Sequence, residues 1–178
     1  ARMMDKDQKY DINTVFEGFK NIGNLDYVSA WYKKAADMIQ RTKIRCAFVS
    51  TNSITQGEQA AILWKPLMTR QGIKIDFAYR TFRWNNETKD MAHVHCVIVG
   101  FSMRSVPIGK VLYGNTIPQK VENINCYLLD APTVFVESRK KPICDVSPVL
   151  FGSMPNDGGW LSDYSDEKKC SIEARYPV

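Results

Sequence analysis

The sequence lacks the features that define several large classes of protein. Its five cysteines are far apart and form no C-x-x-C pair, which argues against a disulfide framework or a cysteine-based zinc site and favours a reducing, cytoplasmic location. No apolar run is long enough to cross a membrane. The first eighteen residues are charged and have no apolar centre, so we expect neither a signal peptide nor a membrane partner.

Motifs for several kinds of catalysis are missing as well. The phosphate-binding pattern G-x-G-x-x-G does not occur, and neither Ser50 nor Ser53 lies in a G-x-S-x-G setting. His93 and His95 are the only histidines, and no carboxylate or cysteine stands at a supporting spacing, so no metal site is expected. The formal net charge of +5 is compatible with nucleic-acid binding but does not require it.

The most informative stretch runs from Ile44 to Met68. Residues 44–49 are apolar and predict a buried strand, and Ser50–Ser53 favour a turn after it. Thr55 and Glu58 have the spacing of a capping box, which predicts the start of a helix. The apolar residues at helical spacing after it are Ala60, Ala61, Trp64, Leu67 and Met68. In open α/β sheets ligands bind beyond the carboxyl ends of strands, where the 50–53 loop would lie.

Two helices and two strands are expected around this stretch. The first helix covers about residues 5–16, and the second covers 27–40 with Asp26 as its cap. The second helix has an apolar face of Val28, Trp31, Ala35 and Met38. Residues 73–79 alternate as a strand, and 94–101 are the most apolar strand. The segment between these strands is too short for a crossover helix, so they should be antiparallel.

The pattern becomes irregular after residue 103. We expect one turn of helix or a short strand at 124–129 and a strand at 133–137. These observations place a boundary near 104–113 and predict two segments, 1–103 and 104–178. The second segment is too poor in core residues to fold well alone.

A polar hairpin loop with two aromatic residues should join the second and third strands. Phe82 and Trp84 stand there beside Arg80 and Arg83. Aromatic rings in a basic loop can stack on nucleic-acid bases, but they can equally form a small core under the loop. From these residues alone both readings stay open. A later basic run can contact phosphate or be a solvated surface, and it consists of Arg139, Lys140 and Lys141.

Four long phrases give the chain a specific resemblance. The chain resembles adenine-N6 DNA methyltransferases of the single-polypeptide restriction–modification family related to MmeI. The phrases lie at Gly23–Ile39, Phe48–Leu67, Ile75–Phe101 and Lys141–Gly159. The family has a class I S-adenosylmethionine (Rossmann-like) fold, with a seven-stranded sheet whose last strand is antiparallel. By this resemblance the strands at 44–49, 73–79 and 94–101 are its fifth, sixth and seventh.

The resemblance also implies what the chain does not contain. The family's cofactor loop and its Asn-Pro-Pro-aromatic motif are absent from the sequence. The opening residues ARMM look like the stretch that follows this motif, so the motif is expected upstream of Ala1. We therefore expect the C-terminal half of a catalytic domain in residues 1–103, and a linker with the start of a target-recognition domain in 104–178. No catalytic or cofactor-binding residue is expected in the chain. S-adenosylmethionine would be bound mainly elsewhere in the parent polypeptide, and the chain alone would be inactive.

The family's adenine-specific members place an aromatic residue after the sixth strand to stack on the extruded base. Phe82 matches this position, with Trp84 as a second candidate or a buttress and Asn52 as a possible neighbour of the base. Double-stranded DNA is the expected partner. The residues expected at its backbone are Arg80, Arg83, Arg139, Lys140 and Lys141.

The fifth strand would lack its usual neighbour and expose an edge, so we expect either a dimer through that edge or cover from the N-terminal segment. Two alternatives remain: a non-catalytic DNA-binding or specificity module, and another enzyme with a Rossmann-like fold, such as a nucleotide-sugar or dinucleotide enzyme.

Overall fold

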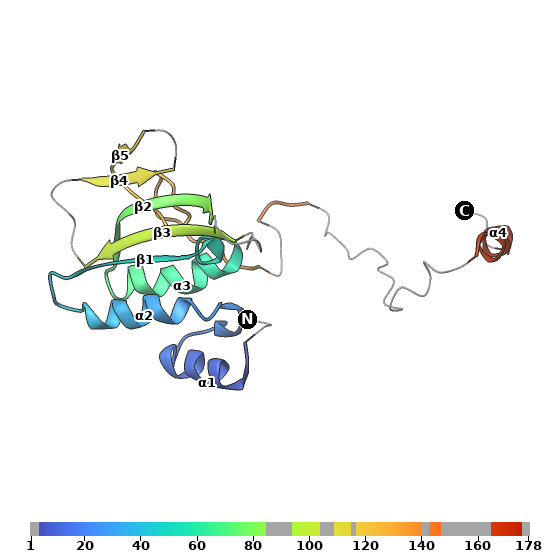
Figure 1. Ribbon diagram of the computed structural model, residues 1–178, viewed down its shortest axis with the longest axis horizontal. Helices are drawn as coiled ribbons and strands as arrows, with labels where there is room; N and C mark the ends of the chain where they lie inside the picture. The colour runs from blue at the N-terminus through green and yellow to red at the C-terminus, as the bar shows by residue number, and fades with distance from the viewer. Residues whose placement is uncertain are drawn as a thin grey trace. The chain divides into compact units, whose positions relative to one another are not determined.

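The computed structural model describes residues 4–84, 94–103, 109–114, 117–139, 143–146 and 165–175 (Figure 1). The chain forms two compact units, Ala1–Ser138 and Arg139–Val178. In the second unit the described residues contain one helix, α4 (Asp166–Arg175). No helix in the described ranges is both long enough and apolar enough to span a membrane.

The first unit is built on a five-stranded mixed sheet. Its strands are β1 (Arg45–Thr51), β2 (Lys74–Arg83), β3 (His95–Ser102), β4 (Lys110–Tyr113) and β5 (Gln119–Val121), in the order β1-β3-β2-β4-β5. The strand β3 is antiparallel to both β1 and β2, and β4 is parallel to β2. The predicted α/β fold is confirmed, and so is the prediction that the third strand is antiparallel.

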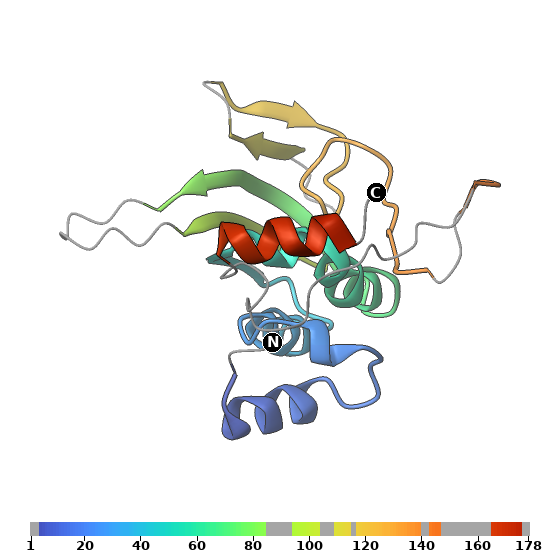
Figure 2. The same cartoon turned by 90° about the vertical axis from the view of Figure 1, so that its right-hand side faces the viewer.

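Two helices cover one face of the sheet. Figures 1 and 2 show α2 (Ser29–Met38) and α3 (Gly57–Thr69) on the same side of the strands, with α1 (Lys6–Val15) farther from the sheet. Short 3-10 helices, η1 (Ile22–Asn24) and η2 (Asn52–Thr55), complete this layer. The core between helices and sheet is centred on the aromatic rings of Tyr32, Trp64 and Phe101, which are fully buried and in mutual contact.

The predicted apolar face of α2 was correct for Ala35, which is buried, and for Val28, which packs against the core, but wrong for Trp31 and Met38. Trp31 and Met38 are 56% and 65% exposed, whereas Tyr32 and Lys33 are buried. Lys33 is accommodated because its ammonium forms an ion pair with Asp37 and lies over the ring of Phe19. The ion pair and the ring contact compensate for the burial of the Lys33 ammonium.

Asp26 does not cap α2 with its side chain, so that prediction was also wrong. The N-cap is Val28, and no side chain bonds to the helix there. The backbone carbonyl of Asp26 accepts a hydrogen bond from the amide of Ser29 instead.

The predicted capping box before α3 is absent. The helix begins at Gly57 with Gln56 as an N-cap that forms no side-chain bond. The hydroxyl of Thr55 donates to the carbonyl of Asn52, and the carboxylate of Glu58 accepts a hydrogen bond from Asn24. Thr55 is therefore used to close η2, and Glu58 to hold a segment distant in sequence.

The strand β1 is longer and less buried than predicted. It continues through Ser50 and Thr51, because both residues pair with β3. Its residues alternate between exposed and half-buried positions, with Ser50 buried. Among the described strands β1 pairs only with β3, and α1 packs mainly against α2, so the N-terminal helix does not supply the expected cover for this edge.

The first unit extends well past the boundary expected near residue 104. The strands β4 and β5 were not predicted, and they extend the sheet beyond β2. Residues 124–129 form turns rather than a helix or strand, and 133–137 form no strand. Ile124, Cys126 and Leu128 are buried in the main core. Residues 109–114 and 117–138 are thus continuous in packing with the described residues before them.

Candidate nucleic-acid interface

The sheet brings together the two segments that the sequence singled out. Thr51, at the end of β1, and Phe82, near the end of β2, both pair with Cys96 of β3, the strand between them. Two strand spacings separate their backbones by about 10 Å. Since β1 and β2 run in the same direction, Phe82 and the residue after Thr51, Asn52, lie at the same edge of the sheet. This is the carboxyl edge, where open α/β sheets bind ligands.

Phe82 belongs to a strand and not to a loop, which corrects the sequence expectation. The register of β2 shifts between Tyr79 and Phe82, after which Phe82 pairs with Cys96 and Arg83 with His95. The amide of Trp84 donates to the carbonyl of Val94 at 2.9 Å, which extends the ladder by one more bond. The hairpin is therefore stiffer at this point than a polar loop would be.

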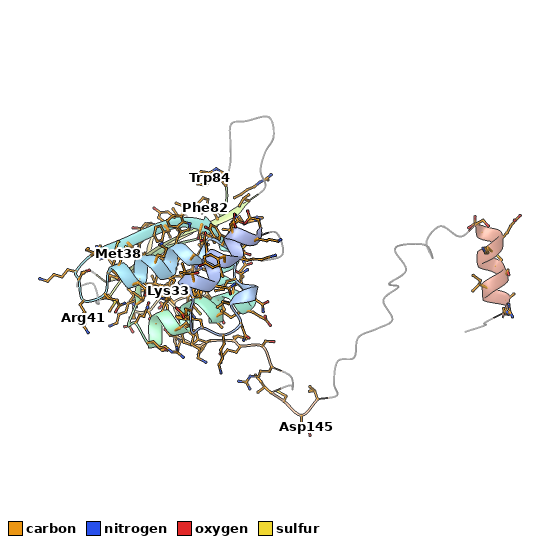
Figure 3. The ribbon with its side chains drawn as sticks, turned by 90° about the horizontal axis from the view of Figure 1, so that it is seen from below. Lys33, Met38, Arg41, Phe82, Trp84 and Asp145 are labelled. Carbon is orange, nitrogen blue, oxygen red and sulfur yellow. The ribbon has the colours of Figure 1, made fainter. Side chains whose placement is uncertain are left out.

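The ring of Phe82 is half-buried and lies close to that of Trp84. Their centroids are 6.4 Å apart, the planes are inclined by 40°, and Trp84 is 45% exposed. Figure 3 shows the two side chains next to each other at one end of the sheet, away from Met38 and Arg41 of the α2 region. Neither ring belongs to the main core. The arrangement offers aromatic surface at the sheet's carboxyl edge.

Asn52 lies in a turn whose backbone is fixed. Its carbonyl accepts a hydrogen bond from the hydroxyl of Thr55, and the indole N–H of Trp64 donates to the carbonyl of Ile54 at 2.9 Å. The side-chain amide of Asn52 is half-exposed and has no partner among the described residues. An amide of this kind can both donate to and accept from a polar ligand.

The end of β1 is also held by a buried hydrogen bond with a residue of α2. The hydroxyl groups of Tyr32 and Ser50 are 2.9 Å apart in a buried contact. Burial of the phenol raises the pKa of Tyr32 to about 12, although the hydrogen bond with Ser50 acts in the opposite direction. Tyr32 is therefore a neutral, structural group under the turn.

The basic residues predicted near DNA have different surroundings. The Nε of Arg80 donates to the backbone carbonyl of Leu128 at 3.1 Å, so this guanidinium has a partner within the protein. Arg83 is exposed near the end of β2, and Arg139 is exposed in the second unit. His93, Lys140 and Lys141 lie outside the described residues.

A buried carboxylate at the opposite end of β2 was missed by the sequence analysis. Asp76 is 3% exposed, accepts a hydrogen bond from Ser102 at 3.1 Å and pairs with Arg45 at 3.4 Å. Burial raises the pKa of Asp76, against the opposing effects of Ser102 and Arg45. Because it lies at the start of β2, it is too far along the strand to act at Phe82. In the sequence Asp76 stands between the apolar residues Ile75 and Phe77, as a solvent-facing residue of a strand would, so the pattern gave no signal that it is buried.

The cavities of the first unit lie away from the carboxyl edge. One cavity has a volume of about 820 Å³ and is lined by residues from the segments 68–75, 109–110, 121–124 and 133–135. Another has a volume of about 330 Å³ and is lined by residues from the segments 18–21 and 61–70 and by Glu137. Neither includes residues 50–55 or 82–84. Within the described ranges no three His, Cys, Asp or Glu side chains cluster as metal ligands would.

Comparison with known proteins gives consistent results. A family profile described as "MmeI, DNA-methyltransferase domain" matches residues 1–114. DNA methyltransferase A of Bacillus subtilis (strain 168) is 43% identical over 170 residues, which cover 93% of this chain. The solved structure of the Type IIL restriction–modification enzyme MmeI in complex with DNA matches with a TM-score of 0.83 and 42% identity over 98% of this chain.

The chain corresponds to a limited part of these relatives. It spans 19% of the length of the Bacillus methyltransferase and 24% of the MmeI chain. The matched region includes the strands and helices that form the carboxyl edge. The family match over residues 1–114 and the two relatives above 40% identity show that the chain belongs to the MmeI DNA-methyltransferase family.

Proposed function

We propose that the chain is part of an enzyme that methylates adenine at N6 in double-stranded DNA, and that Phe82 stacks on the extruded adenine. The observation that carries this proposal is the shared pairing of Thr51 and Phe82 with Cys96, which places an aromatic ring and Asn52 at one edge. An exocyclic amine is inaccessible inside a duplex, so the base must leave the stack. An aromatic face then replaces part of the lost stacking, worth about 1–3 kcal/mol.

In this proposal Trp84 supports the ring of Phe82 or extends the aromatic surface, and the amide of Asn52 faces the base from the end of β1. Both roles agree with the exposure of Trp84 and with the lack of a partner for Asn52 in the described part of the chain. Positioning of the base, rather than acid–base chemistry by these residues, is their contribution to the rate.

S-adenosylmethionine supplies the methyl group in enzymes of this class. The cavities of about 820 and 330 Å³ described above are not lined by residues 50–55 or 82–84. Binding of the cofactor and the catalytic motif are assigned to residues of the longer protein outside this chain. The isolated chain is accordingly proposed to be inactive.

The remaining assignments follow the same proposal. Residues 1–103 contribute to the catalytic domain, and 104–178 contain the linker and the start of target recognition, whose first described segments pack onto the same sheet and core. Arg83 and the basic run Arg139–Lys141 contact the DNA backbone, whereas Arg80 already has a protein partner and is considered below. The open edge of β1 pairs with another strand, either of the longer protein or of a second copy.

The test replaces Phe82 in the full-length protein. Phe82→Ala should lower methylation of adenine-containing duplex DNA by at least about tenfold, in line with the loss of one stacking contact, while leaving cofactor affinity unchanged. Phe82→Tyr should retain most of the activity because it keeps the aromatic face. Tyr10→Ala, which removes an aromatic side chain that is 72% exposed on α1, is the matched control.

The outcomes separate this proposal from its alternatives. Unchanged turnover in Phe82→Ala would remove Phe82 from the site. Specific DNA binding without methyl transfer by the full-length protein would favour a non-catalytic specificity module. Binding of NAD without affinity for DNA would favour a dinucleotide enzyme instead.

A further inference from the structure

Arg80 lies two residues before Phe82, in the irregular part of β2. The regular pairing of β2 with β3 is interrupted between Tyr79 and Phe82, so sheet hydrogen bonds alone do not fix the direction of the hairpin there. A bulge of this kind bends a strand and re-aims the side chains that follow it. Contacts made by Arg80 therefore influence where the ring of Phe82 points.

The contact made by Arg80 is with a turn from the later part of the chain. Its Nε donates to the carbonyl of Leu128 at 3.1 Å. Leu128 has a φ of 57° and its side chain is 2% exposed. Left-handed backbone is uncommon for a residue such as leucine and persists only where the surroundings impose it. The carbonyl that receives Arg80 is thus held in a fixed direction.

The turn, Asn125–Leu129, is closed by backbone hydrogen bonds between Asn125 and both Leu128 and Leu129, and it is further held by the buried side-chain amide of Asn125. The Oδ1 of Asn125 accepts hydrogen bonds from the backbone amides of Tyr127 and Leu129, at 3.0 and 3.1 Å. Its Nδ2 donates to the carbonyl of Pro132 at 3.4 Å, and the residue is only 2% exposed. Asn125 therefore organises the turn through hydrogen bonds to Tyr127, Leu129 and Pro132, all within the same part of the chain.

The stem of Arg80 is confined from another side by the end of β4. A Cβ at Gly114 would lie 2.8 Å from the Cβ of Arg80, so the two backbones approach closely. The rings of Tyr79 and Tyr113 stack at 4.3 Å next to this contact. The bulge before Phe82 is thus packed between β4 and the Asn125–Leu129 turn.

We propose that Arg80 is a positioning residue, which ties the Phe82 hairpin to the Asn125–Leu129 turn and thereby sets the orientation of the base-stacking ring. The inference rests on the proposed function of Phe82. It gives residues beyond 114, where the family profile ends, a direct mechanical connection to the base-binding ring. It also assigns Arg80 a role other than contact with the DNA backbone.

A double-mutant cycle in the full-length protein tests this assignment. If Arg80 acts through Phe82, Arg80→Ala should reduce kcat about ten- to hundredfold with little change in KM for DNA. Adding Arg80→Ala to Phe82→Ala should then cause no further loss, because the two residues act as one unit. Arg80→Lys should lose as much kcat as Arg80→Ala, since an ammonium cannot reproduce the direction of the guanidinium N–H.

A phosphate contact by Arg80 predicts different results. The losses from Arg80→Ala and Phe82→Ala would then multiply, Arg80→Lys would restore much of the binding, and the dependence of DNA affinity on salt would weaken by about one ion in Arg80→Ala. Any of these three results would overturn the inference. Arg70→Ala, which removes an exposed charge at the C-cap of α3, is the control for net charge.

Asn125→Ala provides an independent arm, because it disturbs the turn and leaves Arg80 in place. At a temperature where the variant remains folded by circular dichroism, kcat should fall in the same direction as in Arg80→Ala, and again not further in the Phe82→Ala background. A folded Asn125→Ala protein with normal kcat would overturn the inference. If Phe82→Ala itself has normal turnover, the proposed function fails; if only the cycle is additive, the inference alone fails.

Discussion

The two strand ends that flank Cys96 are built in opposite ways. The end of β1 leads into η2, where Ile54 and Thr55 are buried and the indole of Trp64 holds the backbone. The end of β2 presents Phe82 and Trp84 outside the main core. The end of β1 is fixed by the core, whereas the end of β2 presents partly exposed aromatic rings. Substitutions should therefore reduce stability at the first and activity at the second.

The largest expected effect on stability is in the core that fixes the end of β1. Trp64→Ala removes a fully buried ring that contacts Tyr32 and Phe101, and it should lower the free energy of unfolding of this chain by about 3–5 kcal/mol. Trp31→Ala is the matched control, because this tryptophan is 56% exposed on α2, and it should cost at most about 0.5 kcal/mol. Urea titration of both variants measures the difference. Equal losses of stability in the two variants would contradict the role of Trp64 in fixing the end of β1.

The next effect is a dependence of stability on alkaline pH. Burial raises the pKa of the Tyr32 phenol to about 12 in the folded state, whereas an exposed tyrosine has a pKa of about 10. The unfolded chain therefore loses this proton first as pH rises. Stability from Tyr32 is fully present below pH 10 and falls between pH 10 and 12, by up to about 2–3 kcal/mol.

The Tyr32→Phe variant isolates this contribution. It should be less stable at neutral pH by about 1 kcal/mol, because it loses the hydrogen bond with Ser50, and its stability should decline less than that of the wild type between pH 10 and 12. Tyr10→Phe, at an exposed position of α1, is the control. Parallel curves for wild type and Tyr32→Phe would show that the phenol is not protected.

A smaller effect on stability is expected at Thr55, whose hydroxyl closes the η2 turn. Thr55→Val keeps the shape of a buried side chain but removes the hydroxyl that donates to the carbonyl of Asn52. The loss should be about 1 kcal/mol in the free energy of unfolding. Thr69→Val is the comparison, because its hydroxyl also bonds to a backbone carbonyl but is exposed, and its loss should be smaller. An unaffected Thr55→Val would mean that η2 does not need this bond.

The smallest change in stability is expected at the aromatic surface. Phe82→Ala should lower the free energy of unfolding by about 1 kcal/mol or less, because the ring is only half-buried and lies outside the main core. This is the same variant that should abolish most methylation in the full-length protein. A loss comparable to that of Trp64→Ala would instead make Phe82 a core residue and erase the contrast between the two ends.

The topology was predictable because it depends on chain length. The short segment between β2 and β3 leaves no room for a crossover helix, which forces these strands to be antiparallel. The same count placed Phe82 in the hairpin loop after a strand ending at residue 79. Its inclusion in β2 was not predictable, since the polar residues around it favour a loop locally. Pairing with Cys96 outweighs that preference.

The errors elsewhere share a cause in long-range contacts. Thr55 and Glu58 have the spacing of a capping box, but each bonds elsewhere, and Glu58 does so with Asn24. Lys33 is buried because Asp37 and the Phe19 ring accommodate its charge. The link from Arg80 to Leu128 joins residues forty-eight positions apart. A single sequence read by local pattern contains no signal for such pairs.

The outer side of β1 has a consequence for how this chain behaves in solution. Within the described residues the strand bonds to β3 only, so its remaining amides and carbonyls form a template for one more strand. A short synthetic peptide in extended conformation would find complementary donors and acceptors there without any specific side-chain match. We therefore expect the isolated chain to self-associate above a concentration set by the affinity of this edge for a second strand.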